Sequence, residues 1–141
     1  MRLVFGEKDA PYEEARVVVL PVPYDLSLSF LPGARRGPEA ILLASRYLPI
    51  GLSVAPVPWV AGMAEESHRL IREEALKRLR AGKWLVALGG DHSVTHPLVQ
   101  AHREALGEFS LLHVDAHADL YPEWQGSVYS HASPFYRLLT E

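Results

Sequence analysis

The sequence contains no cysteine among its 141 residues. Disulfide bonds and thiolate chemistry are therefore excluded, which fits a reducing compartment. Met1 is not followed by a long apolar run, so we expect neither a signal peptide nor a membrane span. The net charge of −3 gives no electrostatic reason for binding nucleic acid or an anionic membrane. We therefore expect a cytoplasmic protein with no nucleic-acid or membrane partner.

The composition is that of an ordinary globular protein, with 48% hydrophobic and 22% charged residues. The length suits one domain, and we assign residues 1–141 to it. After a polar arm of about a dozen residues, apolar runs predict strands at 16–22, 84–88 and 109–114, with a short edge strand at 53–57. Helical spacing, prolines and glycines predict helices at 37–48, 63–81, 97–106 and 134–141. This alternation indicates an α/β fold with an open, mainly parallel sheet and helices on both faces.

Potential metal ligands follow two of the predicted strands. Asp115, His117 and Asp119 occupy every second position, and alternate side chains of an extended chain point to one face. His92 follows another strand through two glycines that permit close backbone approach. Because function gathers at the carboxyl ends of parallel strands, these four side chains are expected to meet there. Mixed imidazole and carboxylate donors suit manganese, iron or zinc, although the same residues could simply cap strands in solvent.

Several short motifs resemble those of the ureohydrolases, which include arginases, agmatinases and formiminoglutamases, and they occur along the chain in the same order as in that family. Gly-Gly-Asp-His-Ser and His-Val-Asp-Ala-His-Ala-Asp look like two signature motifs of that family. The segment Gly-Ser-Val-Tyr-Ser-His that ends at residue 131 resembles the agmatinase form of the next motif, and two N-terminal loop segments are also similar. These motifs span residues 89–93, 113–119, 126–131, 22–25 and 32–38.

The resemblance implies a three-layer α/β/α arginase-like domain that holds two Mn²⁺ ions. His92 and Asp119 would be ligands of one ion, His117 a ligand of the other, and Asp115 a bridge between them. A water acidified by both ions would attack a guanidino carbon and release an amine and urea. The guanidino substrate is expected to be agmatine or an aminopropyl derivative rather than arginine.

One further residue enters through the same resemblance. His131 matches a histidine near the substrate and is a candidate for proton transfer or substrate contact, although an alanine follows it where the family usually has glycine. Asp91 is a candidate for orienting His92 or its loop. His113 is assigned a core or supporting role, and His68 is expected to face solvent.

The chain also departs from the family pattern. It contains no aspartate after Asp119, whereas the family has a later Asp-x-Asp motif that completes the metal site. Two carboxylates cannot balance two divalent ions, so we expect single or partial Mn²⁺ occupancy. The sequence therefore resembles the N-terminal half of the domain, truncated after about four strands. Such a half is expected to associate as a homo-oligomer or with a complementary C-terminal half.

Two alternative functions stay open at this point. The chain could be a non-catalytic remnant that acts, if at all, through association. It could also be a metal-dependent amide hydrolase, because the metal-dependent deacetylases resemble this fold, although the Gly-Gly-Asp-His-Ser motif argues against that class. The sequence alone leaves open whether the isolated chain is active.

Overall fold

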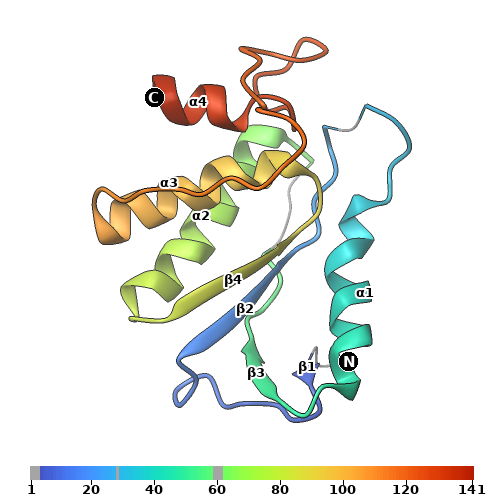
Figure 1. Cartoon of the computed structure of the whole chain (residues 1–141), viewed down its shortest axis with the longest axis vertical. Helices are drawn as coiled ribbons and strands as arrows, with labels where there is room; N and C mark the ends of the chain where they lie inside the picture. The colour runs from blue at the N-terminus through green and yellow to red at the C-terminus, as the bar shows by residue number, and fades with distance from the viewer. Residues whose placement is uncertain (1–3, 28, 59–61) are drawn as a thin grey trace.

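The computed structural model describes residues 4–27, 29–58 and 62–141, and these form an open four-stranded sheet with helices on both faces (Figure 1). The strands are β1 (Phe5–Gly6), β2 (Val17–Val22), β3 (Gly51–Val54) and β4 (Trp84–Gly89). The helices are α1 (Gly37–Ala44), α2 (Ala64–Arg80), α3 (Thr95–Leu106) and α4 (Pro134–Thr140).

The sheet has the order β1-β3-β2-β4. β2 pairs in parallel with both β3 and β4, whereas β1 pairs antiparallel with β3. The sheet is therefore mixed but mainly parallel, as the alternation of elements predicted. The N-terminal segment is more than a polar arm, because it contributes β1 at the sheet edge.

The core lies between the sheet and helices α2 and α3. Val18, Leu20 and Val22 of β2 are fully buried, as is Ile71 of α2. Each such side chain contributes roughly 1.5–3 kcal/mol through its removal from water. α2 begins with glutamates and ends with lysine and arginines, an arrangement that complements the helix dipole. α1 covers the opposite face of the sheet (Figure 1).

The prediction of a strand at 109–114 is wrong. This segment is extended but forms no strand, and it crosses α3 in Figure 1. Its side chains Leu112 and Val114 are 86% and 87% exposed. A strand requires hydrogen bonds to a neighbour, and among the described residues β4 ends the sheet with its outer edge unpaired. The apolar character of the run therefore does not reflect a place in this sheet.

Candidate metal centre

Two loops meet where β2 and β4 end, because parallel strands finish at the same edge of a sheet. The backbone N–H of Asp91 donates to the carbonyl of Tyr24 across these loops, at 2.8 Å. Gly90 makes this approach possible, since a Cβ placed there would lie 1.8 Å from the same carbonyl oxygen. The glycine therefore sets how closely the β4 loop approaches the β2 loop.

Asp91 holds the loop that carries His92. Its side chain is buried, and Oδ1 accepts hydrogen bonds from the backbone N–H of Ser93 at 3.0 Å and from the Ser93 hydroxyl at 2.5 Å. Its other oxygen, Oδ2, accepts from the backbone N–H of Ser27 at 3.1 Å. Asp91 thereby caps the turn His92–Val94 and binds the β2 loop as well.

His92 lies beside the carboxylates that sequence reasoning placed with it. Its Nδ1 lies 2.7 Å from Asp119 Oδ2 and 3.8 Å from Asp115 Oδ2. The ligand atoms of His92, His113, Asp115 and Asp119 all lie within 4.8 Å of one another. Two imidazoles and two carboxylates form a donor set that a divalent transition metal accepts.

His113 is the member of this group that sequence reasoning did not place among the ligands. Its Nε2 is buried, has no hydrogen-bond partner, and lies 3.7 Å from Asp115 Oδ2. Its ring stacks on Phe135 of α4, with centroids 4.0 Å apart. A buried nitrogen without a partner beside two carboxylates is consistent with a group that accepts a cation.

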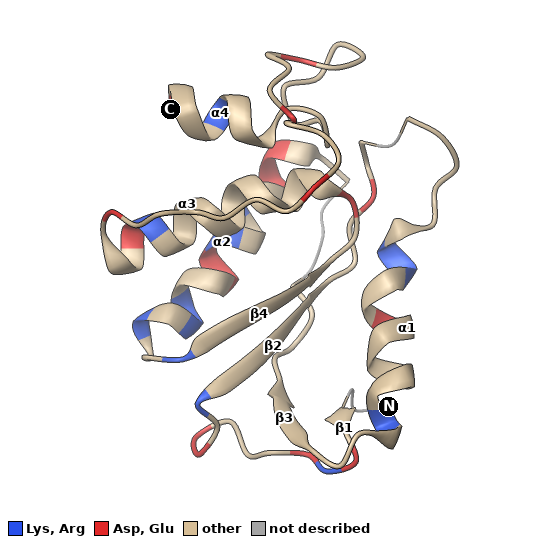
Figure 2. Ribbon diagram, viewed as in Figure 1, with Lys and Arg blue, Asp and Glu red and all other residues tan. Residues whose placement is uncertain are grey.

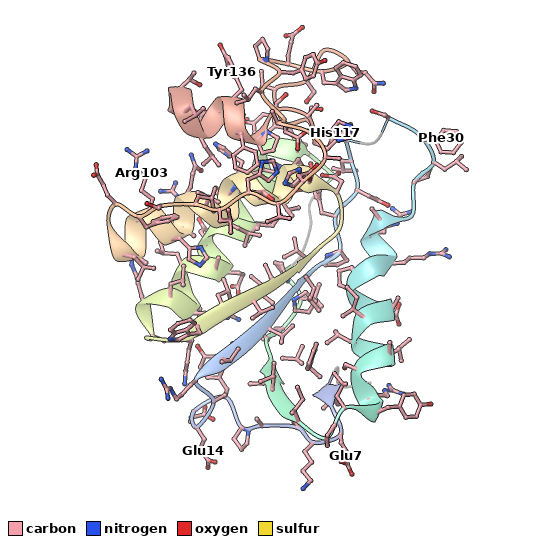
Figure 3. The ribbon with its side chains drawn as sticks, viewed as in Figure 1. Glu7, Glu14, Phe30, Arg103, His117 and Tyr136 are labelled. Carbon is pink, nitrogen blue, oxygen red and sulfur yellow. The ribbon has the colours of Figure 1, made fainter. Side chains whose placement is uncertain are left out.

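His117 lies at the rim of the group. Its side chain is 82% exposed, and its Nδ1 lies 3.6 Å from Asp115 Oδ1 (Figure 3). The backbone N–H of His117 donates to that oxygen at 2.9 Å and lowers the pKa of Asp115. The alternation argument does not describe this segment, because residues 115–117 bend and Asp119 has a φ of 49°.

His131 belongs to a neighbouring set of contacts with the β2 loop. Its Nδ1 contacts the carbonyl of Ser27, and its Nε2 lies 3.1 Å from the Ser29 hydroxyl. Because a carbonyl only accepts, Nδ1 carries the proton, and Nε2 of the neutral ring then accepts from Ser29. His131, His117 and Asp119 line one cavity of about 680 Å³, so the structure brings His131 next to the metal group.

Buried histidines on α2 and α3 were missed. The prediction that His68 faces solvent is wrong, since it is 5% exposed and its ring packs against Tyr24 and Tyr129. Burial lowers the pKa of His68 to about 3. Burial also lowers the pKa of His96, which lies beside it. The apolar side chains one turn away on α2 were the available signal for His68.

The fold and this donor set define an α/β protein with a candidate metal centre at the carboxyl edge of its parallel strands. The model of the arginase family matches residues 15–141, and the chain belongs to that family. Metal dependence is a property of the family, and the His/Asp group is placed to bind a metal ion.

The names of individual relatives describe a narrower group of enzymes than the arginase family as a whole. The chain is 87% identical to an N(1)-aminopropylagmatine ureohydrolase of Thermus thermophilus, covering 100% of this chain and 53% of that protein. It is 32% identical to the agmatinase of Bacillus anthracis, covering 93% and 50%. A putative agmatinase structure from Clostridium difficile matches with a TM-score of 0.81 at 28% identity, covering 92% and 52%. The chain thus spans about half the length of the relatives it matches.

Proposed function

We propose that the chain is the N-terminal half of an agmatinase-type ureohydrolase domain. The reaction is hydrolysis of a guanidino group, of agmatine or N1-aminopropylagmatine, to an amine and urea. The observation that carries this proposal is the gathering of His92, Asp115 and Asp119 at the carboxyl edge of β2 and β4. The names of the relatives support the guanidino substrate class.

The metal is proposed to be Mn²⁺. His92, Asp115 and Asp119 would hold one ion, and His117 with Asp115 would contribute to a second, weaker one. The donor set supports this choice, because imidazole and carboxylate together suit manganese. When bound, the metal supplies Lewis acidity and positive charge, which make water a stronger nucleophile near neutral pH. Described residues offer two carboxylates to this centre, so single or partial occupancy is proposed for the 141-residue chain.

Two further residues are given roles: His131 acts on the substrate, and Asp91 orients a metal ligand. His131 is proposed to contact the substrate or transfer a proton through Nε2, the nitrogen that accepts from Ser29. Asp91 is proposed to fix the direction of His92, since its carboxylate binds both loops at this edge. Water adds to the guanidino carbon, the bond to the alkyl nitrogen breaks, and that nitrogen leaves with a proton.

The chain is further proposed to act in the cytoplasm as a homo-oligomer or with a complementary C-terminal half. Its coverage of about half of each relative supports a missing complement. The outer edge of β4, which no strand of the described ranges pairs with, is a surface on which such a complement would add. Within the described residues, no helix combines the length and apolar character needed to cross a membrane.

Urea release tests this function. The chain is incubated with Mn²⁺ and with agmatine, N1-aminopropylagmatine or arginine, alone and with a separately expressed C-terminal half from a relative. We expect urea from the first two substrates, with a much higher rate when the complement is present, and none from Asp115→Asn. Turnover of an acetylated amine instead would favour an amide hydrolase. No turnover in any mixture would favour a non-catalytic remnant.

A further inference from the structure

We infer that Tyr121 and Trp124 form an aromatic wall that binds the alkylammonium tail of the substrate. This inference rests on the proposed function and extends it to the part of the substrate away from the guanidino group. The two rings meet edge to face, with centroids 5.1 Å apart, and both line the 680 Å³ cavity that also contains Asp119 and His131.

Trp124 is presented by a tight turn. Trp124 and Ser127 exchange both backbone hydrogen bonds, at 3.0 and 3.1 Å, and the two residues between them have φ values of 53° and 76°. Left-handed conformation at both central positions is the geometry of a type I′ turn, and one of these two residues is Gln125 rather than glycine. Such a turn fixes the backbone from which the indole projects.

The indole of Trp124 is also held by Ser29, the residue that contacts His131. Its Nε1–H donates to the Ser29 hydroxyl at 3.2 Å, and that hydroxyl lies 3.1 Å from His131 Nε2. Tyr121 is anchored nearby, because its backbone N–H donates to the carbonyl of Ala132 at 3.1 Å. The aromatic wall therefore has a defined position relative to His131.

Charge favours a cationic occupant. Between Arg103 and Arg137 the sequence contains no lysine or arginine (Figure 2). Among the described residues that line the cavity, the carboxylate is Asp119, and no cationic side chain is present. Because Asp119 is assigned to the metal, the two aromatic rings are the groups left to attract an ammonium group, through cation–π interactions.

The shared cavity gives the place of the ligand. Asp119 belongs both to the metal group and to the cavity, and Tyr121 and Trp124 line that same cavity. A guanidino group bound near Asp119 would therefore place its aliphatic chain in the cavity that the aromatic wall lines. A longer tail with a second ammonium group covers more of this wall, so a triamine should bind more tightly than a diamine.

Calorimetric titration of the 141-residue chain tests the aromatic wall without requiring turnover. The probes are spermidine, 1,4-diaminobutane and the uncharged 1,4-butanediol, in a chelating buffer free of divalent metal. We expect spermidine to bind more tightly than diaminobutane, and butanediol not to bind. Trp124→Leu and Tyr121→Leu should each raise the Kd for spermidine roughly two- to fivefold. The control is Trp84→Leu, which removes an exposed tryptophan from β4 and should leave the Kd unchanged.

The outcomes separate this inference from the proposed function. Equal binding of butanediol and spermidine, or an equal effect of Trp84→Leu, would overturn the aromatic wall. So would unchanged spermidine binding in both cavity variants. Circular dichroism verifies that each variant is folded, and the two cavity substitutions provide independent tests. If no mixture releases urea but spermidine still binds as expected, the proposed function alone would be overturned.

Discussion

Nδ1 of His92 lies 2.7 Å from Oδ2 of Asp119, although the two residues are 27 positions apart. The first follows β4 and the second lies beyond α3, so the fold brings together atoms that the sequence separates. The two atoms lie close enough to each other to serve as ligands of one ion. We expect the direct hydrogen bond to be replaced by coordination when a metal binds.

Removal of the Asp119 charge should therefore abolish tight metal binding. Asp119→Asn keeps the size of the side chain but removes one of the two carboxylates of the group. We expect the Kd for Mn²⁺ to rise by at least roughly tenfold, measured by calorimetric titration. Glu123→Gln is the matched control, because it removes a carboxylate from the exposed loop nearby and should leave the Kd unchanged. An equal effect of the two substitutions would indicate nonspecific charge attraction.

His117 should affect a second, weaker ion rather than the first. The donors His92, Asp115 and Asp119 gather without it, and its side chain is largely exposed. His117→Ala should keep the tight binding event and lose a weak one at high Mn²⁺ concentration, counted by electron paramagnetic resonance of free Mn²⁺. Loss of the tight event would mean that His117 belongs to the first ion's shell.

Asp91 should matter because its hydrogen bonds hold the loop of His92 in place, and not because it adds negative charge to the metal centre. Asp91→Asn weakens three hydrogen bonds from Ser27 and Ser93 within a buried site, and we expect a loss of stability of about 1–3 kcal/mol. Metal affinity should fall by about 10- to 100-fold, as for other residues that orient a ligand. Thermal unfolding and Mn²⁺ titration measure the two effects. Glu39→Gln, on the exposed side of α1, should show neither.

Gly90 should tolerate no side chain. A Cβ at this position would lie 1.8 Å from the carbonyl oxygen of Tyr24 and 2.8 Å from its nitrogen, so the two loops would have to separate. We expect Gly90→Ala to cost more than about 3 kcal/mol of unfolding free energy in urea denaturation. Gly62→Ala provides the comparison, because a Cβ there meets nothing within 4 Å. Similar unfolding midpoints for both variants would contradict the close approach.

Acid should destabilise the fold through His68. Burial lowers its pKa to about 3, with Arg137 and His96 acting in the same direction and Glu141 opposing them. In the unfolded chain histidine has its ordinary pKa of about 6.5, so below that pH the unfolded state binds more protons. Stability should thus fall as the pH decreases from about 6.5, by up to about 1.4 kcal/mol per unit.

His68→Gln should flatten this dependence, measured by urea denaturation between about pH 5 and 7 in chelating buffer. His102→Gln is the control on α3, where the ring contacts a backbone carbonyl of its own helix. An unchanged slope in His68→Gln would show that other groups carry the acid sensitivity.

Most helices and strands could be predicted because the spacing of apolar residues and the residues at the ends of each element depend on neighbouring residues alone. Helix α2 was predicted at 63–81 and is observed at Ala64–Arg80, since its apolar stripe and terminal charges agree. The strand predicted at 109–114 failed because pairing depends on a neighbour that local pattern cannot specify. β1 was missed because two residues carry no periodic signal.

The residues of the site that belong to recognisable sequence motifs could be predicted, and the others could not. Sequence reasoning named His92, Asp115 and Asp119, and the structure brings them together. It did not foresee that His113 shares their group, because that placement depends on the ring of Phe135 from α4. The contact of Ser29 with His131 was also beyond reach, since it joins residues 102 positions apart in two loops.

Metal stoichiometry tests the central claim most directly. The 141-residue chain is loaded with Mn²⁺, dialysed, and its bound metal is determined by mass spectrometry beside Asp119→Asn. We predict at most about one retained ion per chain, lost in the variant, because the described donors offer two carboxylates and two imidazoles to one position. Two tightly retained ions, or retention that Asp119→Asn does not change, would contradict the account.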